Sequence, residues 1–141
     1  MERVTGIGGI FFKARDPRQM MAWYSKHLGI PASSEEESHA MFEWRETKEP
    51  QRPGSTVWAL FPHDTRYFDS SASPFMVNYR VADLDGLLQQ LRLEGVQVAE
   101  HLEEYEYGRF AWITDPEGNR IELWEPPKGT AGRPIEQEKQ G

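Results

Sequence analysis

The chain has 141 residues, no cysteine and a formal net charge of −7, which fits one domain of ordinary size. The missing cysteines exclude disulfides and thiolate metal sites, and the acidic balance argues against a nucleic-acid partner because phosphates would be repelled. No segment approaches the roughly 20 apolar residues of a membrane helix, and the N-terminus lacks the pattern of a secretory signal. We therefore expect a cytoplasmic protein with no membrane partner.

The first half of the chain predicts a strand, a helix and then further strands. Asp16 is a favoured helix N-cap and Pro17 suits the first helical position, so we expect a helix that begins there and ends at Gly29. Apolar residues recur on one face of this helix, at Met20, Tyr24 and Leu28. A short strand should follow near residues 30–33.

The second half predicts the same order of elements. Residues 63–74 are rich in turn formers and small polar side chains, so we expect them to link the two halves. A helix should begin at Asp83 and end at Gly95. Its apolar stripe consists of Leu84, Leu87, Leu88 and Leu91. A short strand is expected near residues 96–100, and proline and glycine predict a hairpin turn at residues 115–119.

Three segments of the first half have counterparts in the second half, in the same order. The pairs are 11–16 with 78–83, 41–44 with 109–112, and 54–62 with 118–126. Chance does not easily explain three matches in register, so we interpret the chain as an internal repeat. On this alignment Asp16 corresponds to Asp83, and Gly54 corresponds to Gly118.

The segment ITDPEGNRIEL at residues 113–123 resembles the most recognisable segment of the vicinal oxygen chelate superfamily. This group contains glyoxalases, bleomycin-resistance proteins and extradiol dioxygenases. The first half carries the matching pairs Asp16-Pro17, Trp23-Tyr24 and Leu28-Gly29. The resemblance covers about residues 4–126. It implies an α+β fold in which two βαβββ modules in tandem form a curved mixed sheet with an open pocket face.

The resemblance also implies how the chain is organised. One domain should span residues 1–126, with modules at about residues 4–62 and 75–126. Residues 127–141 are polar and non-periodic, so we expect a loose tail. The scaffold hosts unrelated chemistries, so the resemblance predicts the fold rather than the reaction. The bleomycin-resistance branch binds compounds without a metal, usually as dimers, and we expect a homodimer.

Strand alternation sorts the side chains of the repeated strands onto two faces. One face is almost wholly apolar, as packing under amphipathic helices requires. The other face is mixed, and its candidate ligand-binding residues are Phe11, Lys13, Trp58, Met76, Asn78, Arg80 and Trp124. A solvated face is the alternative, but large aromatic residues favour a pocket for a small, aromatic or carbonyl-bearing molecule. We expect Asn78 and Arg80 to orient a carbonyl or carboxylate of that ligand.

In metal-dependent relatives, four positions on this face hold the ion, usually through His and Glu. The repeat alignment places these positions at Gly9, Trp58, Met76 or Phe75, and Glu122. Only Glu122 offers a good ligand, whereas a catalytic zinc ion takes about three protein ligands. We therefore expect neither cofactor nor metal. The alternative is a divalent metal held by Glu122 with His63 or His101.

Glu122 is the candidate catalytic residue. Either it pairs with Arg80 or Lys13 across the pocket face, or it acts as a general base whose pKa is adjusted by neighbouring tryptophans. Three functions stay open: sequestration of a small molecule, a metal-assisted glyoxalase-like lyase or dioxygenase, and a non-catalytic regulatory domain. We favour sequestration because the metal ligands are missing and the pocket face is aromatic.

Overall fold

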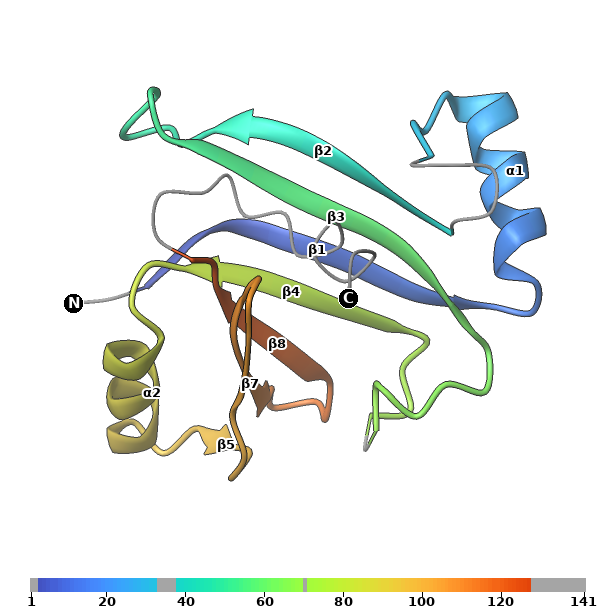
Figure 1. Cartoon of the computed structure of the whole chain (residues 1–141). Coiled ribbons are helices and arrows are strands. Elements are labelled where there is room, and N and C mark those ends of the chain that lie inside the picture. Colours follow the sequence, from blue (N-terminus) through green and yellow to red (C-terminus); the bar gives the residue numbers. More distant parts are fainter. Residues whose placement is uncertain (1–2, 33–37, 70, 128–141) are drawn as a thin grey trace.

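The computed structural model describes residues 3–32, 38–69 and 71–127, which form one sheet and two helices (Figure 1). The helices are α1 (Pro17–Leu28) and α2 (Leu84–Leu93). The strands are β1 (Val4–Ala14), β2 (His39–Arg45), β3 (Pro53–Pro62), β4 (Phe75–Val81), β5 (Gln97–Val98), β6 (Glu103–Tyr105), β7 (Gly108–Thr114) and β8 (Arg120–Glu125). Within these ranges no helix has both the length and the apolar character needed to cross a bilayer.

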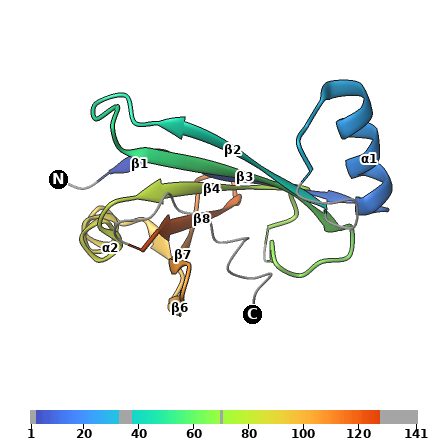
Figure 2. The same cartoon turned by 45° about the horizontal axis from the view of Figure 1, so that its top comes forward.

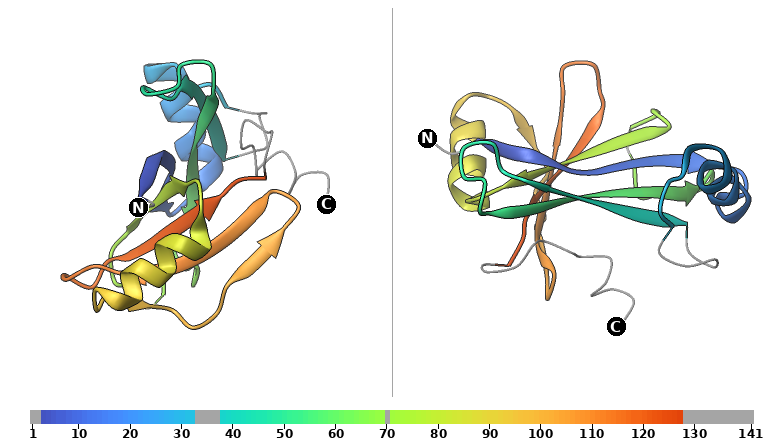
Figure 3. Two further views of the ribbon diagram at one scale, coloured as in Figure 1. Left: turned by 90° about the vertical axis from the view of Figure 1, so that its left-hand side faces the viewer. Right: turned by 90° about the horizontal axis from the view of Figure 1, so that it is seen from above.

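The sheet has eight strands, in the order β2-β3-β1-β4-β8-β7-β5, with β6 paired to β7 outside this path. β1 and β4 pair antiparallel at the centre, and each has a parallel neighbour from its own half, β3 and β8. The sheet twists, so that strands β7 and β8 at one end are rotated relative to β2 and β3 at the other end (Figures 2 and 3). The predicted α+β class and curved mixed sheet are confirmed.

Both helices begin where the sequence predicts. The side chain of Asp16 accepts a hydrogen bond from the backbone N–H of Gln19, and that of Asp83 accepts one from Gly86, each at 3.1 Å. These bonds satisfy N–H groups that lack an intrahelical partner. Gly29 ends α1 with a φ of 71°, in the left-handed region that glycine tolerates. Asp16 and Asp83 therefore occupy equivalent positions in the two halves.

The two helices differ in how far they are buried, and they lie at opposite ends of the sheet (Figures 1 and 3). The α2 stripe packs against the sheet through Leu84, Leu87 and Leu88, all buried with Ala111 and Leu123. In α1 only Met21 is buried. The predicted apolar face of α1 is not buried in the core, since Leu28 is 63% exposed and Met20 and Tyr24 are only half-buried.

The short strands predicted after the helices are only partly present. The second is β5, which covers two residues of the predicted range 96–100. In the range predicted for the first short strand, residues 30–33, Ala32 forms an isolated bridge with Ala40, and Ser33 lies outside the described residues. The expected C-terminal tail also lies outside the described residues from position 128 onward.

The face assignment of β3 was wrong by one residue. Phe11 pairs with Ala59, so Ala59 shares a face with Phe11, and Trp58 lies on the opposite face. There its ring contacts Phe12 and Tyr24, at centroid distances of 5.3 and 4.9 Å. Because Asp16 corresponds to Asp83, Phe11 corresponds to Asn78. Asn78 pairs with Glu122, so the structural counterpart of Glu122 is Ala59 and not Trp58.

The alignment error has a physical cause at Gly54. Gly118 lies in the turn before β8 with a φ of 87°, whereas Gly54 lies inside β3 under the ring of Trp44. Gly118 supplies the positive φ of a turn, whereas Gly54 lets the ring of Trp44 approach the backbone closely. The two glycines are therefore not equivalent. The predicted match of 41–44 with 109–112 is also out of register. Since His39 pairs with Ala59 and Trp112 pairs with Glu122, His39 is the counterpart of Trp112.

The segment between the two halves contributes to the core as well as connecting them. Phe68, within the predicted linker 63–74, is fully buried. It belongs to a core cluster with Phe11, Met76 and Trp112, and its ring lies 5.3 Å from that of Phe61. The linker therefore covers part of one sheet face instead of passing over the surface.

The Phe68→Ala variant tests this role of the linker. Removing a fully buried ring should lower the free energy of unfolding by about 3–5 kcal/mol, because both transfer energy and packing are lost. Leu93→Ala is the matched control, since Leu93 is 78% exposed and its loss should change stability by no more than about 0.5 kcal/mol. Urea denaturation of the two variants measures both values. Equal small effects would show that the linker is not part of the core.

Candidate functional site

A cavity of about 310 Å³ lies on the face of the sheet that carries Phe11, Asn78 and Glu122. Its walls are mostly aromatic. The sheet supplies Phe11, Phe61, Phe110 and Trp124, and the linker, β6 and the turn after it supply Tyr67, Tyr105 and Tyr107. Gly8, Val57 and Ala59 leave room in the wall because their side chains are small or absent. A largely apolar hollow with a few polar groups is typical of a small-molecule site.

Glu122 is the buried polar residue at the inner end of this cavity. Its side chain is 1% exposed, and its neighbours Ile121 and Leu123 point to the opposite face, where they pack with the core under α2. Asn78 on β4 and Trp112 on β7 lie directly beside it in the sheet register. β8 thus holds the carboxylate between two strands that each present a hydrogen-bond donor to it.

Three neutral donors converge on the Glu122 carboxylate. Asn78 Nδ2 donates to Oε1 at 2.6 Å, and Trp112 Nε1 donates to Oε2 at 3.1 Å. The hydroxyl of Tyr67 also donates to Oε2. Burial nevertheless raises the pKa of Glu122 above its ordinary value, because desolvation of the charged form outweighs these bonds and the attraction of Arg120.

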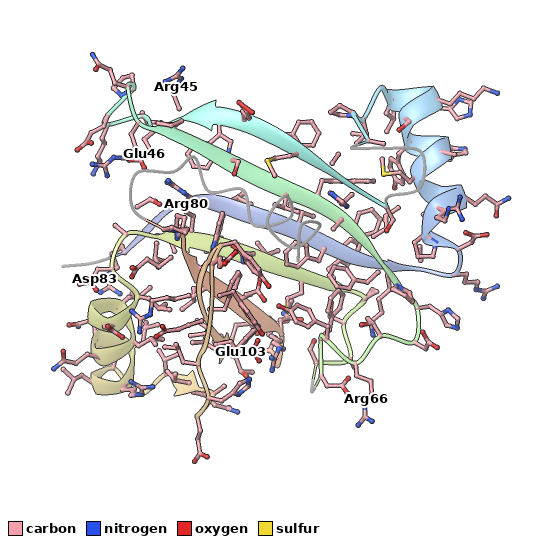
Figure 4. The ribbon with its side chains drawn as sticks, viewed as in Figure 1. Arg45, Glu46, Arg66, Arg80, Asp83 and Glu103 are labelled. Carbon is pink, nitrogen blue, oxygen red and sulfur yellow. The ribbon has the colours of Figure 1, made fainter. Side chains whose placement is uncertain are left out.

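The predicted ion pair of Glu122 with Arg80 or Lys13 is wrong. Arg80 Nη1 donates to Glu46 at 2.9 Å, and its guanidinium lies 5.6 Å from the Trp44 ring centroid. Figure 4 shows Arg80 and Glu46 at the same end of the sheet, near the β2–β3 turn. The Lys13 ammonium lies 5.4 Å from the centroid of the Phe68 ring. Both cations share a face with Glu122, but each is directed to another partner.

The structure brings together half of the predicted site residues. Phe11, Asn78, Glu122 and Trp124 line the cavity. Met76 is buried in the core cluster around it, and Lys13, Trp58 and Arg80 are not among the lining residues. Arg80, which was expected to orient a ligand, does not line this cavity.

Sequence reasoning missed Tyr67 and Trp112, the two donors to Glu122 Oε2. A signal for Trp112 was present, because a hairpin turn at 115–119 places residue 112 opposite residue 122. No comparable signal existed for Tyr67, since a loop residue has no fixed register with a strand. Glu103, which lines the cavity from β6, was also missed, because no strand was predicted at residues 103–105.

The residues at the four positions where relatives hold a metal do not fit an ion. With Trp58 replaced by its correct counterpart Ala59, they are Gly9, Ala59, Met76 and Glu122. His101 is exposed and stacks on Trp112 with ring centroids 4.9 Å apart, and His63 is exposed away from the cavity lining. Within the described ranges, no three His, Asp or Glu side chains are close enough to hold a metal together.

The raised pKa of Glu122 predicts how stability depends on pH. Between the ordinary value of 4.5 and the higher folded value, the native state binds more protons than the unfolded state. The free energy of unfolding therefore falls as pH rises through this interval, by at most about 1.4 kcal/mol per pH unit. In the Glu122→Gln variant this pH-dependent contribution to the free energy of unfolding is absent. The variant should still fold, since its amide oxygen can accept from Tyr67 and Trp112 while its amide nitrogen donates to a rotated Asn78.

Urea denaturation between about pH 4 and pH 8 measures this effect. The stability of the parent minus that of Glu122→Gln should be greatest at low pH. It should decline through the folded pKa and then level off. A difference that rises with pH would mean that the folded state favours the charged carboxylate.

Comparison with known proteins supports the same fold. The profile of the Glyoxalase/Bleomycin resistance protein/Dioxygenase superfamily matches residues 6–123. None of the curated proteins compared matches the chain significantly.

Several solved structures are similar to this chain. Methylmalonyl-CoA epimerase from Mycobacterium tuberculosis is 22% identical with a TM-score of 0.54, over 88% of this chain and 89% of that one. A variant of the Streptomyces coelicolor epimerase in complex with 2-nitronate-propionyl-CoA is 19% identical with a TM-score of 0.62, over 88% and 99%. At these identities the likeness concerns the fold. Together with the profile match over most of its length, it shows that the chain belongs to the glyoxalase, bleomycin-resistance protein and dioxygenase superfamily.

Proposed function

We propose that this protein binds a small, flat aromatic molecule in the cavity above Glu122, without the metal that many superfamily members use. The observation that carries the proposal is the cavity itself, about 310 Å³ in volume, with seven aromatic residues in its wall. Aromatic rings favour stacked or edge-on contacts with flat ligands, and each such pair adds about 0.5–1.5 kcal/mol beyond area burial.

A metal-assisted lyase or dioxygenase is the competing proposal. It needs an ion with several ligands beside the substrate, and Glu122 is the only carboxylate at the four expected positions. Both oxygens of Glu122 already accept hydrogen bonds from protein donors. These contacts favour sequestration of a ligand over metal-assisted chemistry.

The methylmalonyl-CoA substrate of the similar epimerases is not our proposed ligand. A coenzyme A thioester carries several phosphates, and the described residues that line this cavity include no Lys, Arg or His.

We also propose a cytoplasmic homodimer. Support for the dimer comes from large apolar residues exposed on one protomer, among them Trp23, Leu28 and Phe75.

A fragment screen by saturation-transfer NMR tests the binding proposal. Flat aromatic fragments should bind the parent, and binding should survive dialysis against a chelator. Ala59→Leu should weaken binding by roughly tenfold or more, because Ala59 lines the cavity and the larger side chain fills it. Ala22→Leu is the matched control, since Ala22 is exposed on α1.

Two results would count against this proposal. One is a screen in which no aromatic fragment binds the folded parent. The other is a stoichiometric divalent ion, found by elemental analysis, whose removal abolishes binding. The second result would favour the metal-assisted function.

A further inference from the structure

The inner end of the cavity offers two hydrogen-bond acceptors that are not fully used. Asn78 Nδ2, Trp112 Nε1 and the Tyr67 hydroxyl all donate to Glu122. Glu122 Oε1 receives one of these bonds, although a carboxylate oxygen can accept two. Asn78 Oδ1 is buried and has no hydrogen-bond partner among the described residues. A ligand that reaches this end can therefore donate hydrogen bonds to Glu122 Oε1 and Asn78 Oδ1.

Gly8 is what leaves the Asn78 oxygen uncovered. This glycine lines the cavity, and a side chain at position 8 would overlap Asn78 Oδ1 and press on the ring of Trp124. Leaving a buried acceptor without a hydrogen bond is energetically costly. A ligand N–H that reached Asn78 Oδ1 would remove this cost.

The charges around the cavity have one sign. Both Glu122 and Glu103 line the cavity; Glu122 is 1% exposed and the side chain of Glu103 is 39% exposed. Glu103 accepts a hydrogen bond from the Tyr105 hydroxyl at 2.5 Å, which holds the carboxylate beside an aromatic ring. No described Lys, Arg or His lines the cavity, and the nearest basic group to Glu103 is His101, whose Nε2 lies 3.4 Å from Glu103 Oε2. In their ionised forms the two carboxylates attract cations and repel anions.

The aromatic walls favour the same kind of ligand. Tyr105 and Tyr107 are stacked with centroids 5.0 Å apart, and Phe61 and Tyr67 are stacked at 5.6 Å. All four rings line the cavity. The face of an aromatic ring attracts a cation, and the attraction is stronger at desolvated sites.

We propose that the ligand is a cationic aromatic amine: a flat ring system that carries a protonated nitrogen. The ring lies among the aromatic walls, and the ammonium N–H groups donate to Glu122 Oε1 and Asn78 Oδ1. This inference rests on the proposed function, since it assigns a chemical class to the molecule bound in the same cavity. It also replaces the expectation that Asn78 orients a ligand carbonyl or carboxylate.

Three probes of matched shape test the proposal: 2-naphthylmethylamine, 2-naphthylmethanol and 2-naphthoic acid. Isothermal titration calorimetry at about pH 7.5 should show the amine binding at least roughly tenfold more tightly than the alcohol, with the acid weakest. In Glu122→Gln the advantage of the amine over the alcohol should disappear. The amide there uses Asn78 Oδ1 as its partner, so both acceptors are lost while the aromatic walls remain.

Glu103→Gln and Glu104→Gln form a charge-matched pair. Glu104 is the next residue on β6, pairs with Arg109 at 3.3 Å and does not line the cavity. Glu103→Gln should weaken amine binding about two- to fivefold and leave alcohol binding unchanged, because one partly exposed charge is removed. Glu104→Gln should change neither, although it removes the same net charge.

The outcomes separate this inference from the function on which it rests. Equal affinity for the amine and the alcohol, or tighter binding of the acid, would overturn the assignment of a cationic ligand and leave an aromatic pocket. An amine preference that persists in Glu122→Gln would also overturn it. If none of the three probes binds the folded parent, the aromatic-ligand proposal fails as well.

Discussion

A buried carboxylate that contacts no cation among the described residues is the constraint on which this structure depends. Moving a charged carboxylate out of water is costly, so the fold must supply hydrogen bonds in place of the lost hydration. Glu122 receives them from Asn78, Trp112 and Tyr67, which lie on β4, on β7 and in the segment between the two halves. Each bond to a charged group contributes about 1.5–3 kcal/mol, so the site ties three separate segments together.

The two halves have diverged around this constraint. Phe11 and Ala59 in the first half correspond to Asn78 and Glu122 in the second. The first half therefore contributes apolar residues to the cavity wall, and the second half contributes the polar residues at its inner end. The two halves together form a single asymmetric cavity with an aromatic wall and a polar inner end.

Much of the fold was predictable because local signals are strong. The N-caps at Asp16 and Asp83, the leucine stripe of α2 and the turn at 115–119 each have a physical cause that a short segment contains. The phase of β3 was not predictable in this way. Residues 57–61 are apolar without alternation, so the pattern does not say which side faces the cavity. The one-residue error in the predicted phase of β3 placed Trp58 on the wrong face.

The site was predicted less completely than the fold. Glu122 and Asn78 were found because both lie on repeated strands whose faces alternate clearly. The partner of Arg80 is Glu46, in the turn after β2, and that contact joins residues 34 positions apart with no shared register. Tyr67 reaches Glu122 across 55 positions from a loop. Contacts of this kind depend on the folded path of the chain rather than on any local pattern.

The titration of Glu122 itself tests most directly whether a desolvated carboxylate organises this site. Carbon-detected NMR can follow the side-chain carboxyl signals of the parent with pH, and the Glu122 signal is identified by its absence in Glu122→Gln. We expect a midpoint above the ordinary value of 4.5, and a still higher midpoint in Tyr67→Phe, which removes one donor to the charged form. A midpoint at or below 4.5, or one that Tyr67→Phe does not move, would contradict this view of the site.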